Sequence, residues 1–235
     1  MHRLNTIFTL SSLSVLLVTI ERFSFTAKIL LQPYNFLRLH ELIQMTVIIL
    51  ITVVLPFFLF REVTNNFETI KNKGFFLALL FIIGIYFYAT GNGLHEVSSF
   101  NFNNFCDPKN FSSQLCKELF FNDYYTGNIL YFLGGGLMVV SLMLLELLKP
   151  NQTFQKKDFK ITVINAVVYA LAIFAYAAFD VVSVGIIYSI IIAAIATYLF
   201  LKIKNGYLNY PIITYTFLTY LIGTLAALIV RFHLF

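Results

Sequence analysis

Seven long apolar runs fill most of this 235-residue chain, and their length constrains the fold more than any other feature. Each comes close to the about 20 residues that a helix needs to cross the hydrocarbon core of a bilayer. Lipid offers a backbone no hydrogen bonds, so each span must satisfy its own polar groups, as a helix does. With 59% apolar and 11% charged residues, the chain could not cover itself with polar groups in water. We therefore predict an all-α polytopic membrane protein, a seven-transmembrane helix bundle.

The spans belong to a single predicted domain over 1–235, and charged or turn-rich segments separate most of them. The region around Asp180 alone separates the fifth and sixth spans, which predicts a tight helical hairpin. The first run could instead be a secretory signal peptide, but Glu21 and Arg22 follow it without a small-residue cleavage site, which favours a retained helix. The spans are expected at about 5–24, 41–60, 74–96, 123–147, 160–180, 183–202 and 210–231, with an outer loop at 97–122.

Basic residues set the expected orientation. With the N-terminus in the cytoplasm, ten Lys and Arg residues fall on the inner side and six on the outer side. The positive-inside rule then predicts a cytoplasmic N-terminus and an external C-terminus. Because the net charge of +5 comes from these short segments, it does not indicate nucleic-acid binding. The expected partners are membrane lipids and a lipid or small-molecule ligand, and the sequence leaves the oligomeric state open.

Both cysteines of the chain, Cys106 and Cys116, lie in the predicted outer loop. An external loop meets an oxidising environment, so the pair favours a disulfide; the alternative is two free thiols in a reducing compartment. The glycosylation sequon Asn110-Phe111-Ser112 lies in the same loop. The 14 tyrosines of the chain are expected to anchor span ends at the membrane interface.

Ionisable residues at the ends of the spans gather toward the predicted outer side. A charge at the centre of a span costs about 2.5–3.5 kcal/mol on insertion, so such residues face the bundle interior, a cavity or the interface. Glu146 is the acid near the inner end of a span. The outer group is Glu21, Arg22, His40, Glu41, His95, Glu96, Asp123, Asp180, Arg231 and His233.

The most concentrated polar stretch covers 91–96 and 122–128, at the junction of the third and fourth spans. A neutral imidazole and a carboxylate suit a divalent metal such as zinc, and the same pair can perform general acid–base chemistry. The stretch therefore predicts a site centred on His95 and Asp123. The candidate set comprises Asp123 and Glu96 as catalytic groups, His95, Asp123 and His40 as metal ligands, and Asn92, Asn128 and Asp180 as ligand-binding residues.

A structural interpretation of the same residues stays open. Polar side chains at a span end can cap helices and hydrogen-bond at the interface. Asp180 is placed to cap the sixth span, since Asp is a favoured N-cap residue. His40 and Glu41 can likewise serve as a cap and interfacial anchor.

Seven spans, with a histidine late in the third and an aspartate early in the fourth, resemble the CREST superfamily of seven-span membrane hydrolases, which includes alkaline ceramidases and adiponectin-receptor-like proteins. The resemblance implies a zinc ion on His95 and Asp123 that activates water against a lipid amide. The chain departs from the family pattern in the last span, where His233 stands without the family's HxxxH, and at Gly91, where the family has a serine. The resemblance thus covers the span count and two residues.

Three functions remain as hypotheses. The first is a divergent metal-assisted hydrolase of a lipid amide or ester near the outer leaflet. The second is a transporter or receptor-like bundle that binds a small ligand in an outward-facing pocket. The third is a structural assembly protein whose polar residues anchor its ends. The sequence contains no P-loop, no HExxH and no regularly spaced arginines, which argues against nucleotide hydrolysis, zincin proteases and voltage sensing.

Overall fold

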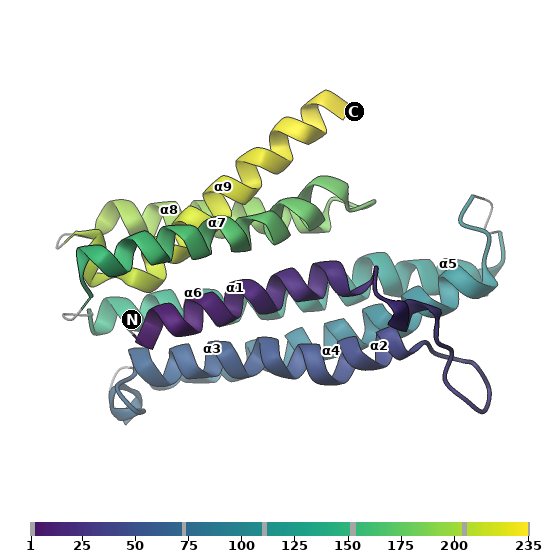
Figure 1. Ribbon diagram of the computed structural model, residues 1–235, viewed down its shortest axis with the longest axis horizontal. Helices are drawn as coiled ribbons and strands as arrows, with labels where there is room; N and C mark the ends of the chain where they lie inside the picture. The colour runs from purple at the N-terminus through teal and green to yellow at the C-terminus, as the bar shows by residue number, and fades with distance from the viewer. Residues whose placement is uncertain (1–2, 72–73, 110–111, 151–153, 204–205, 235) are drawn as a thin grey trace.

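The computed structural model describes residues 3–71, 74–109, 112–150, 154–203 and 206–234. Helices make up 84% of the structure, and no β-strand occurs within these ranges. Seven helical segments are long and apolar enough to cross a membrane (Figure 1). The predicted all-α, seven-helix membrane protein is therefore confirmed. The cytoplasmic placement of the N-terminus stays a prediction.

The long helices are α1 (Arg3–Glu21), α3 (Ile49–Val63), α4 (Phe75–Phe105), α6 (Asn128–Leu148), α7 (Lys156–Phe179), α8 (Val184–Lys202) and α9 (Pro211–Leu234). Shorter elements are the 3-10 helices η1 (Phe25–Lys28), η3 (Glu68–Lys71) and η5 (Tyr207–Asn209), the α-helices α2 (Leu39–Ile43) and α5 (Gln114–Phe121), and the π-helical segments η2 (Gln44–Ile48) and η4 (Asn122–Gly127).

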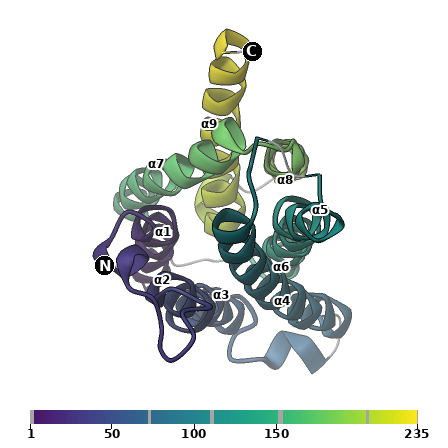
Figure 2. The ribbon, with the colours of Figure 1, turned by 90° about the vertical axis from the view of Figure 1, so that its right-hand side faces the viewer.

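The long helices pack in the ring order α1, α3, α4, α6, α8, α9, α7 and back to α1 (Figure 2). We call the end of the bundle that carries α5 the disulfide end, because Cys106 and Cys116 are bonded there. The expected disulfide is thus confirmed. α9 starts among the other helices at the opposite end and leans out of the bundle toward its C-terminus (Figure 1). The tilt takes α9 away from α6, while Arg231 near the end of α9 stays bonded to the backbone oxygens of Ala177 and Asp180 at the end of α7.

The predicted outer loop at 97–122 is wrong in its extent. α4 continues to Phe105, and α5 covers Gln114–Phe121, so most of this segment is helical. Phe102 of the extension packs on Phe120 of α5, with 5.5 Å between ring centroids. Three side chains in the extension donate to the backbone carbonyl four residues earlier, which keeps a polar stretch helical: Asn101, Asn103 and Asn104. The first two residues of the sequon lie outside the described residues.

Glycines bring α4 and α6 into close contact. A Cβ atom at Gly134 would lie 2.2 Å from the backbone nitrogen of Tyr88, and one at Gly91 would lie 2.2 Å from that of Tyr131. Any larger residue would therefore force the two backbones apart, as at small-residue contacts in other membrane helices. This contact fixes α4, which carries His95, against α6, which directly follows the segment η4 that carries Asp123.

Hydrogen bonds join α1 to α7 near the opposite end. Asn5 donates to the backbone oxygen of Asp158 at 3.0 Å, and Ser12 donates to that of Asn165 at 2.8 Å. Asn165 in turn donates to the Thr9 hydroxyl at 2.9 Å. Within the described residues, no hydrogen bond from α1 beyond Ser12 reaches α7. The two helices are thus held together over one half of their length.

Glu146, near the end of α6, holds the start of α9. Its two carboxylate oxygens accept the backbone N–H groups of Ile212 and Ile213 at 2.9 and 2.8 Å. Helix N-termini leave such N–H groups without intrahelical partners, and their partial positive charge favours a carboxylate. Glu146 therefore does from a neighbouring helix what an N-cap side chain does from within one.

Glu146→Ala is expected to lower the free energy of unfolding by about 3 kcal/mol, because two buried N–H groups lose their charged acceptor. Thermal and denaturant unfolding of the purified protein in detergent would measure this. The control is Glu118→Ala on the exposed surface of α5, expected to change stability by less than about 0.5 kcal/mol. Equal effects of the two substitutions would contradict this role for Glu146.

Candidate functional site

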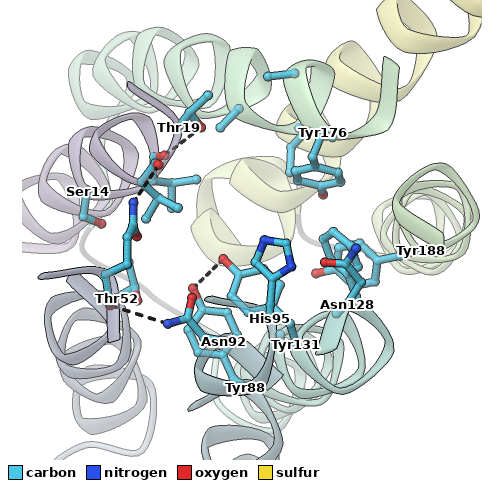
Figure 3. A pocket seen from close by; sticks show the side chains of 18 of the residues that line it. Ser14, Thr19, Thr52, Tyr88, Asn92, His95, Asn128, Tyr131, Tyr176 and Tyr188 are labelled. Carbon is cyan, nitrogen blue, oxygen red and sulfur yellow. Dashed lines mark hydrogen bonds between the residues drawn. The ribbon is translucent and has the colours of Figure 1, made fainter. Parts of the chain in front are cut away.

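One cavity of about 780 Å³ extends through the middle of the bundle, and all seven long helices line it (Figure 3). It reaches the surface at the disulfide end, where its lining residues Phe23 and Val181 are 82% and 70% exposed. Its far end is closed by buried residues of α1 and α9, among them Phe8 and Ile212. Among the residues that the structure describes, the pocket is therefore deep and opens to the surface at the disulfide end.

His95 and Asp123 meet at the cavity wall. Nδ1 of His95 lies 2.8 Å from the Asp123 carboxylate and 3.2 Å from the Asp123 backbone oxygen. The imidazole projects into the cavity in Figure 3. Since Asp123 can only accept there, Nδ1 carries the hydrogen in this pair and Nε2 is left toward the cavity. The sequence-predicted pair is thus brought into direct contact.

Local backbone geometry explains how these two residues meet. Asp123 belongs to the π-helical segment η4, in which one extra residue per turn widens the helix. Gly127 of the same segment lies so close to α4 that a Cβ there would be 2.9 Å from the backbone nitrogen of His95. π-helical turns frequently occur at functional sites. The second such segment, η2, also lines the cavity, through Gln44.

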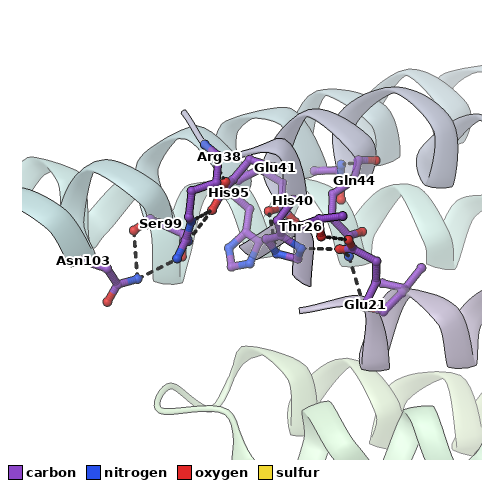
Figure 4. A network of polar contacts seen from close by, with 12 residues as sticks. Glu21, Thr26, Arg38, His40, Glu41, Gln44, His95, Ser99 and Asn103 are labelled. Carbon is purple, nitrogen blue, oxygen red and sulfur yellow. Dashed lines mark hydrogen bonds and ion pairs between the residues drawn. The ribbon is translucent and has the colours of Figure 1, made fainter. Parts of the chain in front are cut away.

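A second network surrounds Glu21 at the end of α1 (Figure 4). Nδ1 of His40 and the hydroxyl of Thr26 hydrogen-bond to the Glu21 carboxylate, and Gln44 donates to it at 3.3 Å. Nε2 of His40 faces Glu96 at 3.9 Å. His40 therefore lies between the buried carboxylate of Glu21 on α1 and the half-buried carboxylate of Glu96 on α4, at the mouth of the cavity.

Arg38 and Glu41 form a separate ion pair beside this network. Nε of Arg38 donates to the Glu41 carboxylate at 2.7 Å, and the Arg38 backbone N–H donates to the same group at 3.0 Å. Glu41 thereby completes a capping box at the start of α2, so the capping role considered for it is present. The arginine also lies over the ring of Phe100, 5.5 Å from its centroid.

The remaining predicted site residues line the same cavity. Asn92 donates to the backbone oxygen of Gln44 at 3.5 Å, and Asn128 donates to that of Tyr124 at 3.1 Å. Asp180 lies just before α8, whose N-cap residue is Ser183 rather than Asp180, and its carboxylate interacts with the backbone N–H groups of Val182 and Gly185. Burial raises the pKa of the Asp180 carboxyl, while those N–H groups and the nearby His95 and Arg231 act against the increase.

The residues present do not fit a zinc ion. A zinc site needs three or four ligands around one point. Across the described ranges, no group of three or more His, Cys, Asp or Glu side chains is placed to hold a metal ion. His40, the expected third ligand, is engaged with Glu21 through Nδ1. Zinc binding by His95 and Asp123 stays a prediction.

Sequence reasoning missed the tyrosines of the cavity. They were expected as anchors at the membrane interface, but seven of them line its deep part, which we call the tyrosine chamber. These tyrosines lie on α4, α6, α7, α8 and α9. Neither composition nor residue spacing could have shown that tyrosines so far apart in the chain face one cavity. They are Tyr88, Tyr131, Tyr169, Tyr176, Tyr188, Tyr215 and Tyr220.

Comparisons with protein-family models, curated proteins and solved structures found no match to this chain. The resemblance to the CREST superfamily therefore stays a hypothesis on the residues given above. The function must be argued from the cavity itself.

His40→Ala is expected to lower the free energy of unfolding by about 3 kcal/mol, because it leaves the buried Glu21 carboxylate without its main partner. Hydrogen exchange should rise in 22–38, the segment between α1 and α2. His233→Ala, on the exposed end of α9, is the matched control and should change neither quantity. Unfolding curves and exchange measured by mass spectrometry check both. Unchanged protection in 22–38 would argue against this role of His40.

Proposed function

We propose that this protein binds a small lipid-soluble molecule in its central cavity, as a receptor-like or transporter-like bundle. The observation that carries the proposal is the 780 Å³ cavity with a surface opening at the disulfide end. Ligand pockets in proteins span roughly 300–1,000 Å³ and combine apolar walls with a few placed polar groups. The cavity fits both descriptions.

The distribution of charge along the cavity supports an amphiphilic site. Every charged side chain among its described lining residues lies toward the disulfide end: Arg22, Arg38, His40, Glu41, His95, Glu96, Asp123 and Asp180. Aromatic rings, aliphatic side chains and uncharged hydroxyl groups line the deep part. A ligand that fills the cavity would therefore meet charged groups near the mouth and aromatic groups further in.

The lack of hydrogen bonds between α1 and α7 near the mouth, within the described residues, supports access from the lipid. Val15 and Val18 of α1 and Ala175 and Phe179 of α7 line the cavity beyond the last hydrogen bond between the two helices. Leu17 on the next face of α1 is exposed, as a lipid-facing residue would be. A molecule dissolved in the membrane could pass between these helices into the cavity.

Closure of the opposite end favours binding from one side. Glu146 holds α9 against α6 there, and the Asn5 bonds hold α1 against α7. A transporter would have to break these interactions to release its ligand at the opposite end, whereas a receptor would keep them. The transporter-like and receptor-like forms of the proposal therefore differ in whether the opposite end of the bundle opens.

Val18→Phe is expected to displace the ligand, because the larger ring would occupy the cavity. Leu17→Phe adds the same ring to the lipid-facing side of the same helix and should leave binding intact. The measurement is the amount of lipid-soluble small molecule that co-purifies with each variant in lipid nanodiscs, quantified by mass spectrometry. Equal amounts in the two variants, or none in the unmodified protein, would sink the proposal.

A second candidate is hydrolysis of a lipid ester or amide, favoured by the geometry of His95. With Nδ1 held by Asp123, Nε2 could take a proton from water as the water oxygen attacks a carbonyl carbon in the cavity. The imidazolium would then return the proton to the departing alcohol or amine. Asp123 would stabilise the charged ring.

His95→Gln and Asp123→Asn should then reduce hydrolysis of a fluorogenic lipid ester by about 10²-fold or more, the usual contribution of a general base. His233→Gln is the control. Metal content of the same preparations, compared between unmodified protein and His95→Gln, also decides the zinc prediction. Ester cleavage unaffected by both substitutions would rule out this candidate while leaving ligand binding in place.

A further inference from the structure

The hydroxyl groups of the tyrosine chamber are not all satisfied. Within the described chain, Oγ of Ser11, Oγ1 of Thr219 and the hydroxyl of Tyr176 have no hydrogen-bond partner, and all three residues line the cavity. Thr219 is only 1% exposed. An unsatisfied buried hydroxyl costs roughly 1–3 kcal/mol, so such groups normally have a partner. Because three such hydroxyls on three helices face one cavity, we expect a molecule in the cavity to supply their hydrogen-bond partners.

A contrast within the chamber shows which kind of partner is missing. Tyr215 and Ser12 form a completed chain, since Ser12 donates to the Asn165 backbone oxygen and must accept from Tyr215 at 2.6 Å. Tyr188 and Tyr220 share one bond of 2.6 Å, which uses one of their two hydroxyl hydrogens. The chamber therefore has hydroxyl hydrogens left over, and a ligand with acceptor oxygens would give them a partner.

The chamber carries no charge to match an ion. None of the described residues that line it is Asp, Glu, Lys, Arg or His, since the charged lining residues lie toward the disulfide end. A cation or anion moved here would lose its hydration without a counter-charge, which is costly in an apolar interior. Aromatic rings stack on flat partners, as Phe132 does on Tyr188 with centroids 4.8 Å apart. Their faces also attract cations, so a cationic ring is the competing ligand that the test must include.

From these observations we infer that the tyrosine chamber is a subsite for a neutral ring that carries carbonyl oxygens, as in a lipid-soluble quinone. The oxygens accept hydrogen bonds from the spare hydroxyls of Thr219 and Tyr176, and the ring packs among the aromatic side chains. An alkyl tail on the ring extends between α1 and α7 toward the lipid. The inference rests on the proposed ligand-binding function and names the class of ligand.

The test uses three probes with the same ten-carbon tail, added to the full-length protein in lipid nanodiscs: decylubiquinone, decylbenzene and decylpyridinium. The first has a neutral ring with carbonyl oxygens, the second lacks oxygen, and the third is a cation. Decylubiquinone should raise the unfolding temperature in a concentration-dependent way, because a ligand that binds the folded state stabilises it. The other two should raise it much less.

Thr219→Val and Tyr176→Phe should each weaken decylubiquinone binding about fivefold, the effect of losing one ordinary hydrogen bond. Thr224→Val is the matched control. Thr224 lies on the same helix, is buried and likewise lacks a hydrogen-bond partner in the described chain, but it does not line the cavity. It should leave the affinity unchanged.

Three results would overturn the inference: equal stabilisation by decylbenzene, tighter binding of decylpyridinium, or an equal loss of affinity in Thr219→Val and Thr224→Val. Failure of all three probes to bind would also overturn it, with water as the partner of the hydroxyls. In that case, loss of a co-purified ligand in Val18→Phe would still support the proposed ligand-binding function. If decylubiquinone does bind, loss of its binding in Val18→Phe but not in Leu17→Phe would support both the ligand-binding function and the subsite for a neutral ring.

Discussion

Two backbone hydrogen bonds from the start of α9 to the buried carboxylate of Glu146 fix the shape of this bundle. They hold α9 at the opposite end, where the Asn5 and Ser12 bonds also join α1 to α7. At the disulfide end α9 stays bonded to α7, because Arg231 donates to the backbone oxygens of Ala177 and Asp180 at 2.7 and 2.8 Å. Within the described residues no hydrogen bond joins α9 to α6, or α1 to α7, at that end. The mouth of the cavity lies where these helix pairs are joined only at the opposite end.

The fold could be predicted from the sequence because the bilayer leaves few alternatives to a chain of seven apolar runs. The pairing of the two cysteines followed from their shared segment. The extent of the outer loop could not be predicted, because its asparagines bond back to their own helix where sequence rules expect them to end it. That outcome depends on packing of Phe102 against α5, which local sequence does not encode.

The candidate site was predictable only in part. His95 and Asp123 were singled out because ionisable residues near a membrane span are rare and stand out, and the structure places them in contact. The engagement of His40 with Glu21 could not be anticipated, since it depends on how α1 and α2 fold together. The tyrosine chamber was missed because an aromatic residue in an apolar span looks alike whether it faces lipid or a cavity.

The π-helical segment η4 has a further consequence for how this chain can vary. A π-turn holds one residue more than the α-helical turn it replaces. The wider π-turn covers the same full circle with one more residue, so loss of a single residue from this segment would restore a regular helix without turning α5 relative to α6. The widened turn that brings Asp123 to His95 would be lost, while the helices on either side would keep their orientation. A deletion far too small to disturb a membrane span would therefore alter the site and leave the bundle around it in place.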